Sequence, residues 1–283
     1  MNHLPFTRLL SLASRQLLAG AQCDFKGKAW MLFWLCGDSD DLLLLTSRDS
    51  AAGALPELKK YATFSRVAVS DDSQRLNLYG LIGLEAAHAL TEMPSPEAPV
   101  LSTAWGKLIR LPWPSLRFIC VVADETAFRQ ALPATISNAS AELWTRLDIE
   151  AGYPQLSTTT INQYVPQALN LHLLDGISFT KGCYMGQETV ARMKYRGGNK
   201  RGVFRLIGSA ATRPVAGSDI ELKLGDDWRH IGVVLQAAGQ GNDVEVQAVL
   251  PLDSDCRAEF RLANDDASRL QLAALPYPLD SAS

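Results

Sequence analysis

Residues 181–201 read KGCYMGQETVARMKYRGGNKR, and they look less like ordinary core packing than any other stretch of this 283-residue chain. Gly182 and Gly186 bracket Cys183, so the backbone can turn tightly here and approach a ligand closely. The run from 187 to 195 contains no proline and several good helix formers, and a glycine pair follows it. This pattern predicts a ligand-contacting loop followed by a helix.

Cys183 has two interpretations. It lies just before the expected helix N-terminus, where free backbone N–H groups and the helix dipole favour a thiolate, and Lys181 adds positive charge. These features favour a reactive or ligand-contacting thiol. A free cysteine is also commonly a small buried packing residue, and the residue type alone favours that second interpretation.

Five cations crowd the last ten residues of the stretch, although the chain carries a net charge of −3: Arg192, Lys194, Arg196, Lys200 and Arg201. Surface cations often serve solubility only, but this density indicates binding of an anion. Tyr195 is the one aromatic residue among them, which weakens a base-stacking role. An anionic small molecule is therefore favoured over direct recognition of RNA.

The composition, with 47% hydrophobic and 20% charged residues, indicates a soluble globular protein of two or three domains. We expect neither a membrane-spanning run nor a signal peptide. Five scattered cysteines without a C-x-x-C pair argue against a disulfide scaffold and a self-contained zinc or iron–sulfur site. Four histidines form no i, i+4 pair, so no metal site is predicted. The chain is expected to be cytoplasmic.

Strand and helix signals alternate through the first part of the chain. Apolar runs at 30–36 and 42–46 flank a polar turn and predict a hairpin of buried strands. We expect a helix at 51–61, strands at 66–69 and 76–82, and a short helix at 84–90. This order predicts a layered α+β sandwich.

A connector with three prolines at 93–99 separates this part from the next. After it we expect two strands, two helices and a polar ordered loop, at 104–111, 116–123, 126–132, 140–147 and 157–167 respectively. Beyond Arg201 the pattern is strand-like and punctuated by glycine, with expected strands at 203–207, 220–224, 230–235, 244–249 and 256–262. Their spacing predicts a small β-barrel.

The octapeptide at 181–188 resembles the signature Lys-Gly-Cys-Tyr-x-Gly-Gln-Glu of the YgfZ family. These are folate-binding proteins linked to tRNA modification and to the upkeep of iron–sulfur enzymes, and they are relatives of the glycine cleavage T-protein. Further matches lie downstream and upstream, at Val190–Arg192, Gly197–Arg201, Glu150–Pro154, Asn170–Leu171 and Gly176–Phe179. The run is long and rich in residue types that rarely recur by chance.

The resemblance implies folate as the ligand, in the form of tetrahydrofolate with one or several glutamates in its tail. It makes Cys183 the chemical centre and places Trp144 at the family's second folate-contacting tryptophan, where the indole would stack on the pterin. A half-buried core tryptophan is the alternative for Trp144. The loop around the thiol would be shaped by Lys181, Gly182, Tyr184, Gly186, Gln187 and Glu188, and the basic run could hold the anionic tail.

The resemblance also implies α+β sandwich domains of the T-protein type and a C-terminal β-barrel. We expect residues 1–46 and 120–200 to form the first, folate-binding domain, 47–119 the second α+β domain, and 201–283 the barrel. Residues 1–16 lack the Gly-x-Asp and Gln-Gly-Gln-x-Thr-x-Asp elements with which the family begins. The usual opening segment, with one of the two tryptophans, is therefore expected to be missing.

Three functions follow as hypotheses. The first is a folate-binding accessory protein for iron–sulfur enzymes, including tRNA-modifying ones. The second is a folate-dependent aminomethyltransferase like the T-protein, and the third is a scaffold that binds partner proteins through the basic run. The motifs of nucleophile-elbow hydrolases, P-loop proteins and dinucleotide enzymes are absent from the sequence, and we lean towards a protein that is not an enzyme.

If Cys183 is a reactive thiol, it should have a lowered pKa and react with iodoacetamide at neutral pH faster than the other four cysteines. Three of those lie in expected strands, and Cys23 lies in the loop before Lys26. Cys183→Ala should fold normally but fail to rescue iron–sulfur enzyme activity in cells that lack the protein. Cys183→Ser tests whether hydrogen bonding alone suffices. A fully active, equally stable Cys183→Ala protein would show that the residue only packs.

Overall fold

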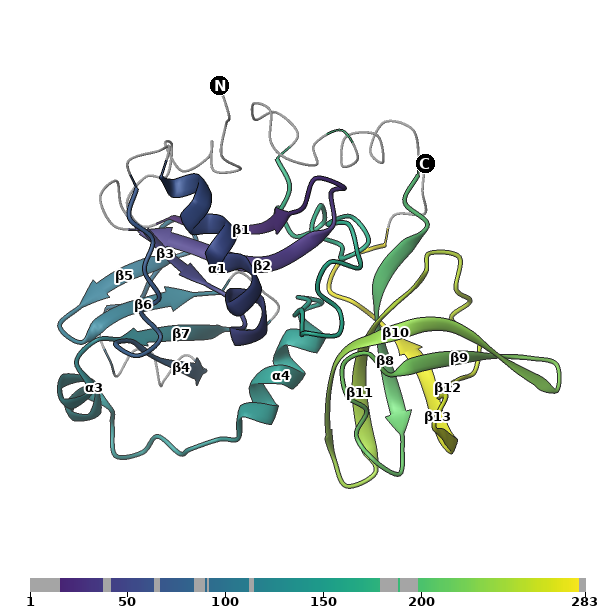
Figure 1. Ribbon diagram of the computed structural model, residues 1–283. Helices are drawn as coiled ribbons and strands as arrows, with labels where there is room; N and C mark the ends of the chain where they lie inside the picture. Colours follow the sequence, from purple (N-terminus) through teal and green to yellow (C-terminus); the bar gives the residue numbers. More distant parts are fainter. Residues whose placement is uncertain are drawn as a thin grey trace.

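The computed structural model describes residues 16–37, 42–63, 67–83, 90, 92–111, 115–178, 188 and 198–279. Within these ranges the chain forms two antiparallel sheets with their helices and a closed β-barrel. Helix α4 (Ala141–Glu150) lies between the sheets and the barrel (Figure 1). The α+β architecture with a C-terminal barrel is therefore confirmed.

The first sheet has three antiparallel strands in the order β1-β2-β3, namely β1 (Gln16–Cys23), β2 (Ala29–Gly37) and β3 (Leu42–Leu45). The expected hairpin is confirmed, since Trp34 of β2 pairs with Leu45 of β3. Strand β2 is apolar on both sides because it lies between two layers. On one side Met31 and Phe33 pack with Ala54 of helix α1 (Arg48–Ala62).

The second sheet has the strand order β4-β7-β6-β5, with β4 (Asn77–Ile82), β5 (Val100–Thr103), β6 (Gly106–Arg110) and β7 (Arg117–Val122). Side chains alternate between its two faces. On one face Phe118 packs with Phe128 of helix α3 (Glu125–Ala131). On the other face Val121 packs with Cys36 of β2, which joins the two sheets in one core.

Several expectations about this region change. The expected strand at 66–69 is wrong, because residues 67–70 form no strand, and the expected helix at 84–90 lies outside the described residues except for Leu90. Strands β1 and β5 were not expected. Gly20 of β1 serves packing, since a Cβ there would lie 2.6 Å from the Phe33 ring. The division into domains stays a prediction, and β7 runs across its boundary between 119 and 120.

Residues 151–178 connect the sheets to the barrel and consist mainly of turns, which agrees with the ordered loop expected at 157–167. Leu169 and Leu171 of this segment are buried in a cluster with Leu32 of β2. The same cluster contains Val203 and Val249 of the barrel. A continuous apolar core therefore runs from the first sheet into the barrel.

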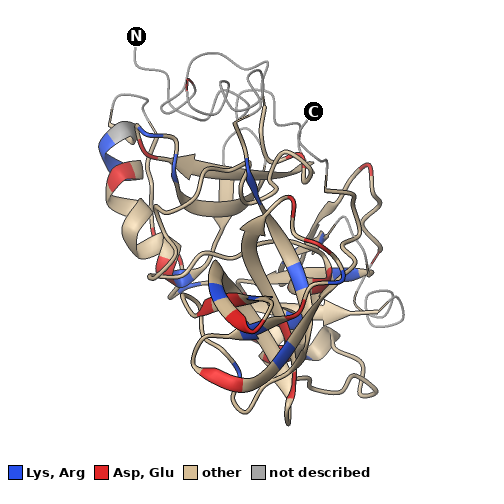
Figure 2. Ribbon diagram, turned by 90° about the vertical axis from the view of Figure 1, so that its right-hand side faces the viewer, with Lys and Arg blue, Asp and Glu red and all other residues tan. Residues whose placement is uncertain are grey.

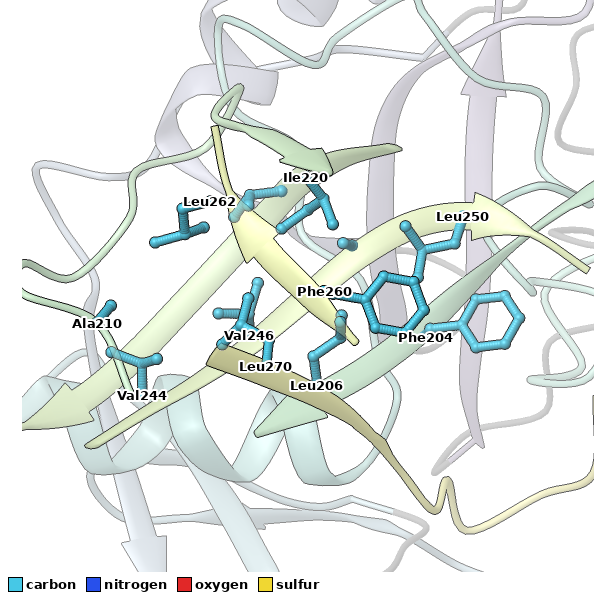
Figure 3. Close-up of a cluster of buried hydrophobic side chains, with 12 residues drawn as sticks. Phe204, Leu206, Ala210, Ile220, Val244, Val246, Leu250, Phe260, Leu262 and Leu270 are labelled. Atoms are coloured by element: carbon cyan, nitrogen blue, oxygen red, sulfur yellow. The ribbon is translucent and has the colours of Figure 1, made fainter. Parts of the chain in front are cut away.

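The barrel closes in the strand order β10-β11-β8-β13-β12-β9. Its strands are β8 (Arg201–Ser209), β9 (Asp219–Leu224), β10 (Asp227–Gln240), β11 (Asp243–Pro251), β12 (Phe260–Leu262) and β13 (Asp265–Ala273). Leu206, Ile220, Val246 and Phe260 fill its interior and are fully buried (Figure 3). Strand β13 was not expected, although it pairs with β8 and β12 and completes the closure.

Asn170 joins the connecting segment to the barrel by acting like a strand residue. Its Nδ2 donates to the carbonyl oxygen of Val203 at 2.8 Å, and its Oδ1 accepts from the Val203 N–H at 3.1 Å. The side chain is 1% exposed and the backbone has φ 57°, a left-handed conformation that asparagine tolerates well. A second contact is made by Tyr277, whose hydroxyl donates to the Gly152 carbonyl oxygen at 2.8 Å.

Asn170→Ala should lower the free energy of unfolding by about 2–4 kcal/mol, because both polar groups of Val203 would be left buried without partners. Urea unfolding followed by circular dichroism measures this change. The control is Asn77→Ala, which removes one exposed 3.3 Å hydrogen bond to Glu125 and should cost less than about 0.5 kcal/mol. Equal losses in the two variants would show that the contact with Val203 is unimportant.

Candidate functional site

Helix α4 has two functional faces because of its residue spacing. Glu142, Arg146 and Glu150 follow one another at intervals of four residues and share one face. Trp144 and Asp148 are also four residues apart, but they are offset by two positions, which turns them about 200° around the helix axis. One face therefore meets the barrel and the other meets the second sheet.

The barrel face of α4 is held by charged groups. Arg146 Nε lies 3.2 Å from Glu150 and 2.9 Å from Glu245 of β11, and Arg205 of β8 lies 3.0 Å from the same Glu245. At the start of the helix, Glu142 accepts hydrogen bonds from the Gly239 N–H at 2.8 Å and from an Arg213 Nη1 at 2.5 Å. These bonds hold the pKa of Glu142 below its usual value.

Acidic and basic residues are interspersed over the barrel strands in Figure 2, in keeping with this paired network. A groove of about 590 Å³ lies between α4 and the barrel, on the opposite side of the helix from Trp144. Its lining contains one acid, Glu142, and one base, Arg213, which pair with each other. The groove therefore offers no unpaired charge for an ionic ligand.

The other face of α4 presents Trp144, which is half-buried. The Arg117 guanidinium carbon of β7 lies 4.8 Å from the centroid of the indole ring, a cation–π contact. The benzo edge of the indole lies against β4 at Gly80, where an added Cβ would come within 2.2 Å of Trp144 Cε3. Two elements of the second sheet thus fix the position of the indole.

Asp148 lies one helical turn after Trp144 and forms a buried ion pair with the same arginine. Arg117 Nη1 is 2.7 Å from Asp148 Oδ1, and the side chains are 2% and 9% exposed. Burial raises the pKa of Asp148 to about 6, although the positive charge of Arg117 opposes the shift. Arg117 Nε is buried and has no hydrogen-bond partner among the described residues.

Most of the site expected from the sequence cannot be compared with this geometry. Residues 179–187 and 189–197 lie outside the described residues, and they include Lys181, Gly182, Cys183, Tyr184, Gly186, Gln187, Arg192, Lys194 and Arg196. Glu188 is helical and exposed, and Lys200 is exposed. Arg201 is exposed at the start of β8 and donates to the Ile231 carbonyl oxygen at 3.1 Å.

The other cysteines and tryptophans can be placed. Cys36 and Cys120 are buried, and burial raises the pKa of the Cys120 thiol to about 12. Cys256 is exposed and precedes β12, so the expected strand starting at 256 is wrong at its beginning. Its exposure means that alkylation of Cys183 is best measured in a Cys256→Ser background.

The residues that hold Trp144 were missed in the sequence. Arg117 stands inside the apolar run of β7, and Asp148 stands between Leu147 and Ile149 of α4. A lone charge in an apolar strand and an acid four residues after a tryptophan were the available signals. Gly80 gave no signal, because its role depends on a contact with a residue 64 positions away.

Metal binding and membrane insertion were also examined in the described ranges. No three His, Cys, Asp or Glu side chains there lie close enough together to hold a metal ion. None of the helices in the same part of the chain reaches the length and hydrophobicity that a membrane span requires.

Comparison with known proteins adds the family. The model of the "YgfZ, beta-barrel domain" family matches residues 199–266. The "tRNA-modifying protein YgfZ" of Escherichia coli (strain K12) is 41% identical over 276 residues, which cover 95% of this chain and 84% of that protein. The chain belongs to the YgfZ family. The protein of the same name from Shigella flexneri matches to the same extent.

A solved structure extends the likeness to the fold of the whole YgfZ-family chain. The crystal structure of glycine cleavage system aminomethyltransferase T from Bartonella henselae superposes with a TM-score of 0.69. It covers 94% of this chain and 77% of that chain at 16% sequence identity. At this identity the likeness shows the fold alone, and it confirms the expected T-protein architecture.

Gly80→Ala should displace the indole of Trp144 and lower the free energy of unfolding by about 1–3 kcal/mol, because the new Cβ overlaps the ring. Urea unfolding and the tryptophan emission maximum measure the two effects. The control is Gly53→Ala in α1, where nothing lies within 4 Å and alanine should stabilise the helix by up to about 1 kcal/mol. Stabilisation by both substitutions would contradict the close contact at Gly80.

The raised pKa of Asp148 predicts a pH dependence. Its folded pKa of about 6 exceeds the ordinary value of 3.8, so the folded state holds the proton more tightly. The stability that this proton contributes is present at low pH and is lost as the pH rises from about 4 to about 6, by at most about 1.4 kcal/mol per pH unit. The difference in unfolding free energy between wild type and Asp148→Asn isolates this slope. A difference that is constant or rises over this range contradicts the shift.

Proposed function

We propose that this protein is a folate-binding accessory protein that supports the upkeep of iron–sulfur enzymes and, through them, tRNA modification. Its membership of a family whose relatives are named tRNA-modifying proteins supports the biological role. The observation that carries the ligand is the placement of Trp144, a half-buried indole held at the junction of α4 and the second sheet.

The geometry at Trp144 fits a flat aromatic ligand. An indole held by Arg117 on one face and by Gly80 along one edge pays little additional ordering cost when a ring stacks on it. A pterin is planar and offers a π-face for stacking. Trp144 would therefore hold the pterin of tetrahydrofolate.

Two further parts of the proposal rest on the sequence. Cys183 would be the chemical centre, and the cations Arg192, Lys194, Arg196, Lys200 and Arg201 would hold the glutamate tail. Of these, Lys200 and Arg201 are exposed at the start of the barrel. Iron–sulfur enzymes would be the protein partners, and the work would take place in the cytoplasm.

The second candidate is a folate-dependent aminomethyltransferase. The superposition on aminomethyltransferase T favours it, although that likeness extends to the fold only. Transfer of a one-carbon group to tetrahydrofolate, measured with the purified protein and a methylene donor, separates the two candidates. An accessory protein should bind tetrahydrofolate without catalysing this transfer.

Trp144→Ala should weaken tetrahydrofolate binding by about 1–3 kcal/mol if the pterin stacks on the indole. Isothermal titration calorimetry measures the dissociation constant, and binding to the wild type should also quench tryptophan fluorescence. Trp144→Phe keeps an aromatic face and should retain part of the affinity, which guards against a general loss of folding.

Trp228 provides a matched control, because it is also half-buried and stacked by an arginine, with Arg261 at 4.5 Å from its ring centroid. Trp228→Ala lies on the barrel and should leave the dissociation constant unchanged. An unchanged constant in Trp144→Ala would remove this residue from the binding site, and a wild type that does not bind tetrahydrofolate would refute the proposed function.

A further inference from the structure

We propose that Arg117 is a positioning residue for ligand binding, which covers one face of the Trp144 indole and thereby leaves the opposite face to a planar heteroaromatic ligand. The inference rests on the proposed function, because it concerns the same tryptophan. It assigns the arrangement of the stack to a buried residue of β7 that would not itself touch the ligand. Three observations carry it.

The guanidinium of Arg117 is held rigidly. Its strand β7 is paired on both sides, with Ile82 of β4 opposite Arg117 itself and β6 along the other edge. The side chain is 2% exposed, and its Nη1 lies 2.7 Å from the Asp148 carboxylate on α4. A long side chain fixed at its backbone and at its tip has few rotamers left, so it can define the plane against which an indole rests.

The indole is constrained from two directions. The Arg117 guanidinium carbon lies 4.8 Å from its ring centroid, and the backbone of Gly80 meets its benzo edge. A cation and an aromatic ring attract each other most strongly when the cation lies over the ring face. Since Trp144 remains half-buried, part of the indole stays accessible, and the face away from Arg117 is the one left for stacking.

Packing alone is a weak explanation for an arginine at this position. A buried ion pair loses much of its attraction to desolvation, and apolar residues of similar volume are often as stabilising or more so. Arg117 Nε also lacks a hydrogen-bond partner among the described residues, which adds a further cost. A residue that is expensive for stability and lies against the proposed ligand-binding tryptophan is better explained by its action on that tryptophan.

The test compares three variants by calorimetric titration with tetrahydrofolate. Arg117→Met combined with Asp148→Asn removes both charges while keeping similar volumes, and it should weaken binding roughly tenfold. Asp148→Asn alone keeps the guanidinium over the indole and should weaken binding less. Arg261→Met removes the equivalent cation from Trp228 on the barrel and should leave the affinity unchanged.

A second measurement separates positioning from general stability. The indole N–H resonance of Trp144, assigned in ¹⁵N spectra by its loss in Trp144→Phe, should shift in the double variant without ligand and shift less in Asp148→Asn. If the double variant does not fold, Arg117→Lys replaces it, because lysine keeps the charge beside Asp148 but has no flat guanidinium to stack. It should shift the same resonance and weaken binding.

The outcomes distinguish the two claims. Tetrahydrofolate binding that Trp144→Ala weakens and the double variant leaves at the wild-type value overturns the role of Arg117 and leaves the proposed function standing. An unmoved Trp144 resonance in a folded double variant overturns it as well. A wild type that binds no tetrahydrofolate contradicts the proposed function, and the inference falls with it.

Discussion

Helix α4 is bound on both sides, and the relative position of the two halves of the described chain depends on this arrangement. On one side Glu142, Arg146 and Glu150 pair with the barrel, through Gly239, Arg213, Glu245 and Arg205. On the other side Asp148 pairs with Arg117 of the second sheet, and Trp144 packs against Gly80. A ten-residue helix can serve both partners because two residues of offset turn a side chain to its opposite side.

The contacts at this junction are mainly directional rather than apolar. The partly exposed ion pairs between α4 and the barrel contribute modest stability, and the buried pair with Arg117 is offset by desolvation. Asn170 and Tyr277 add hydrogen bonds with defined geometry between the connecting segment, the barrel and the chain end. Such contacts specify an orientation more than they raise stability, and the orientation they specify is that of Trp144.

The sequence predicted the elements whose signals are local. Alternating and continuous apolar runs gave the β2–β3 hairpin, helices α3 and α4 and most barrel strands, because those patterns follow from the burial of each element. Strand β1 was missed because Gly20 resembles a turn residue until Phe33 is placed beside it. The motif around Cys183 identified the family but lies outside the described residues, whereas Arg117, Gly80 and Asp148 were missed because their roles arise only from contacts between distant segments.

The central claim is that the indole of Trp144, held by Arg117 and Gly80, is the surface on which a pterin stacks. Nuclear Overhauser measurements between tetrahydrofolate and protein with labelled tryptophan indoles test it directly. The account predicts intermolecular signals from the pterin protons to the ring protons of Trp144 and none to those of Trp228. Signals to another tryptophan with none to Trp144, in a protein that binds tetrahydrofolate, would contradict it.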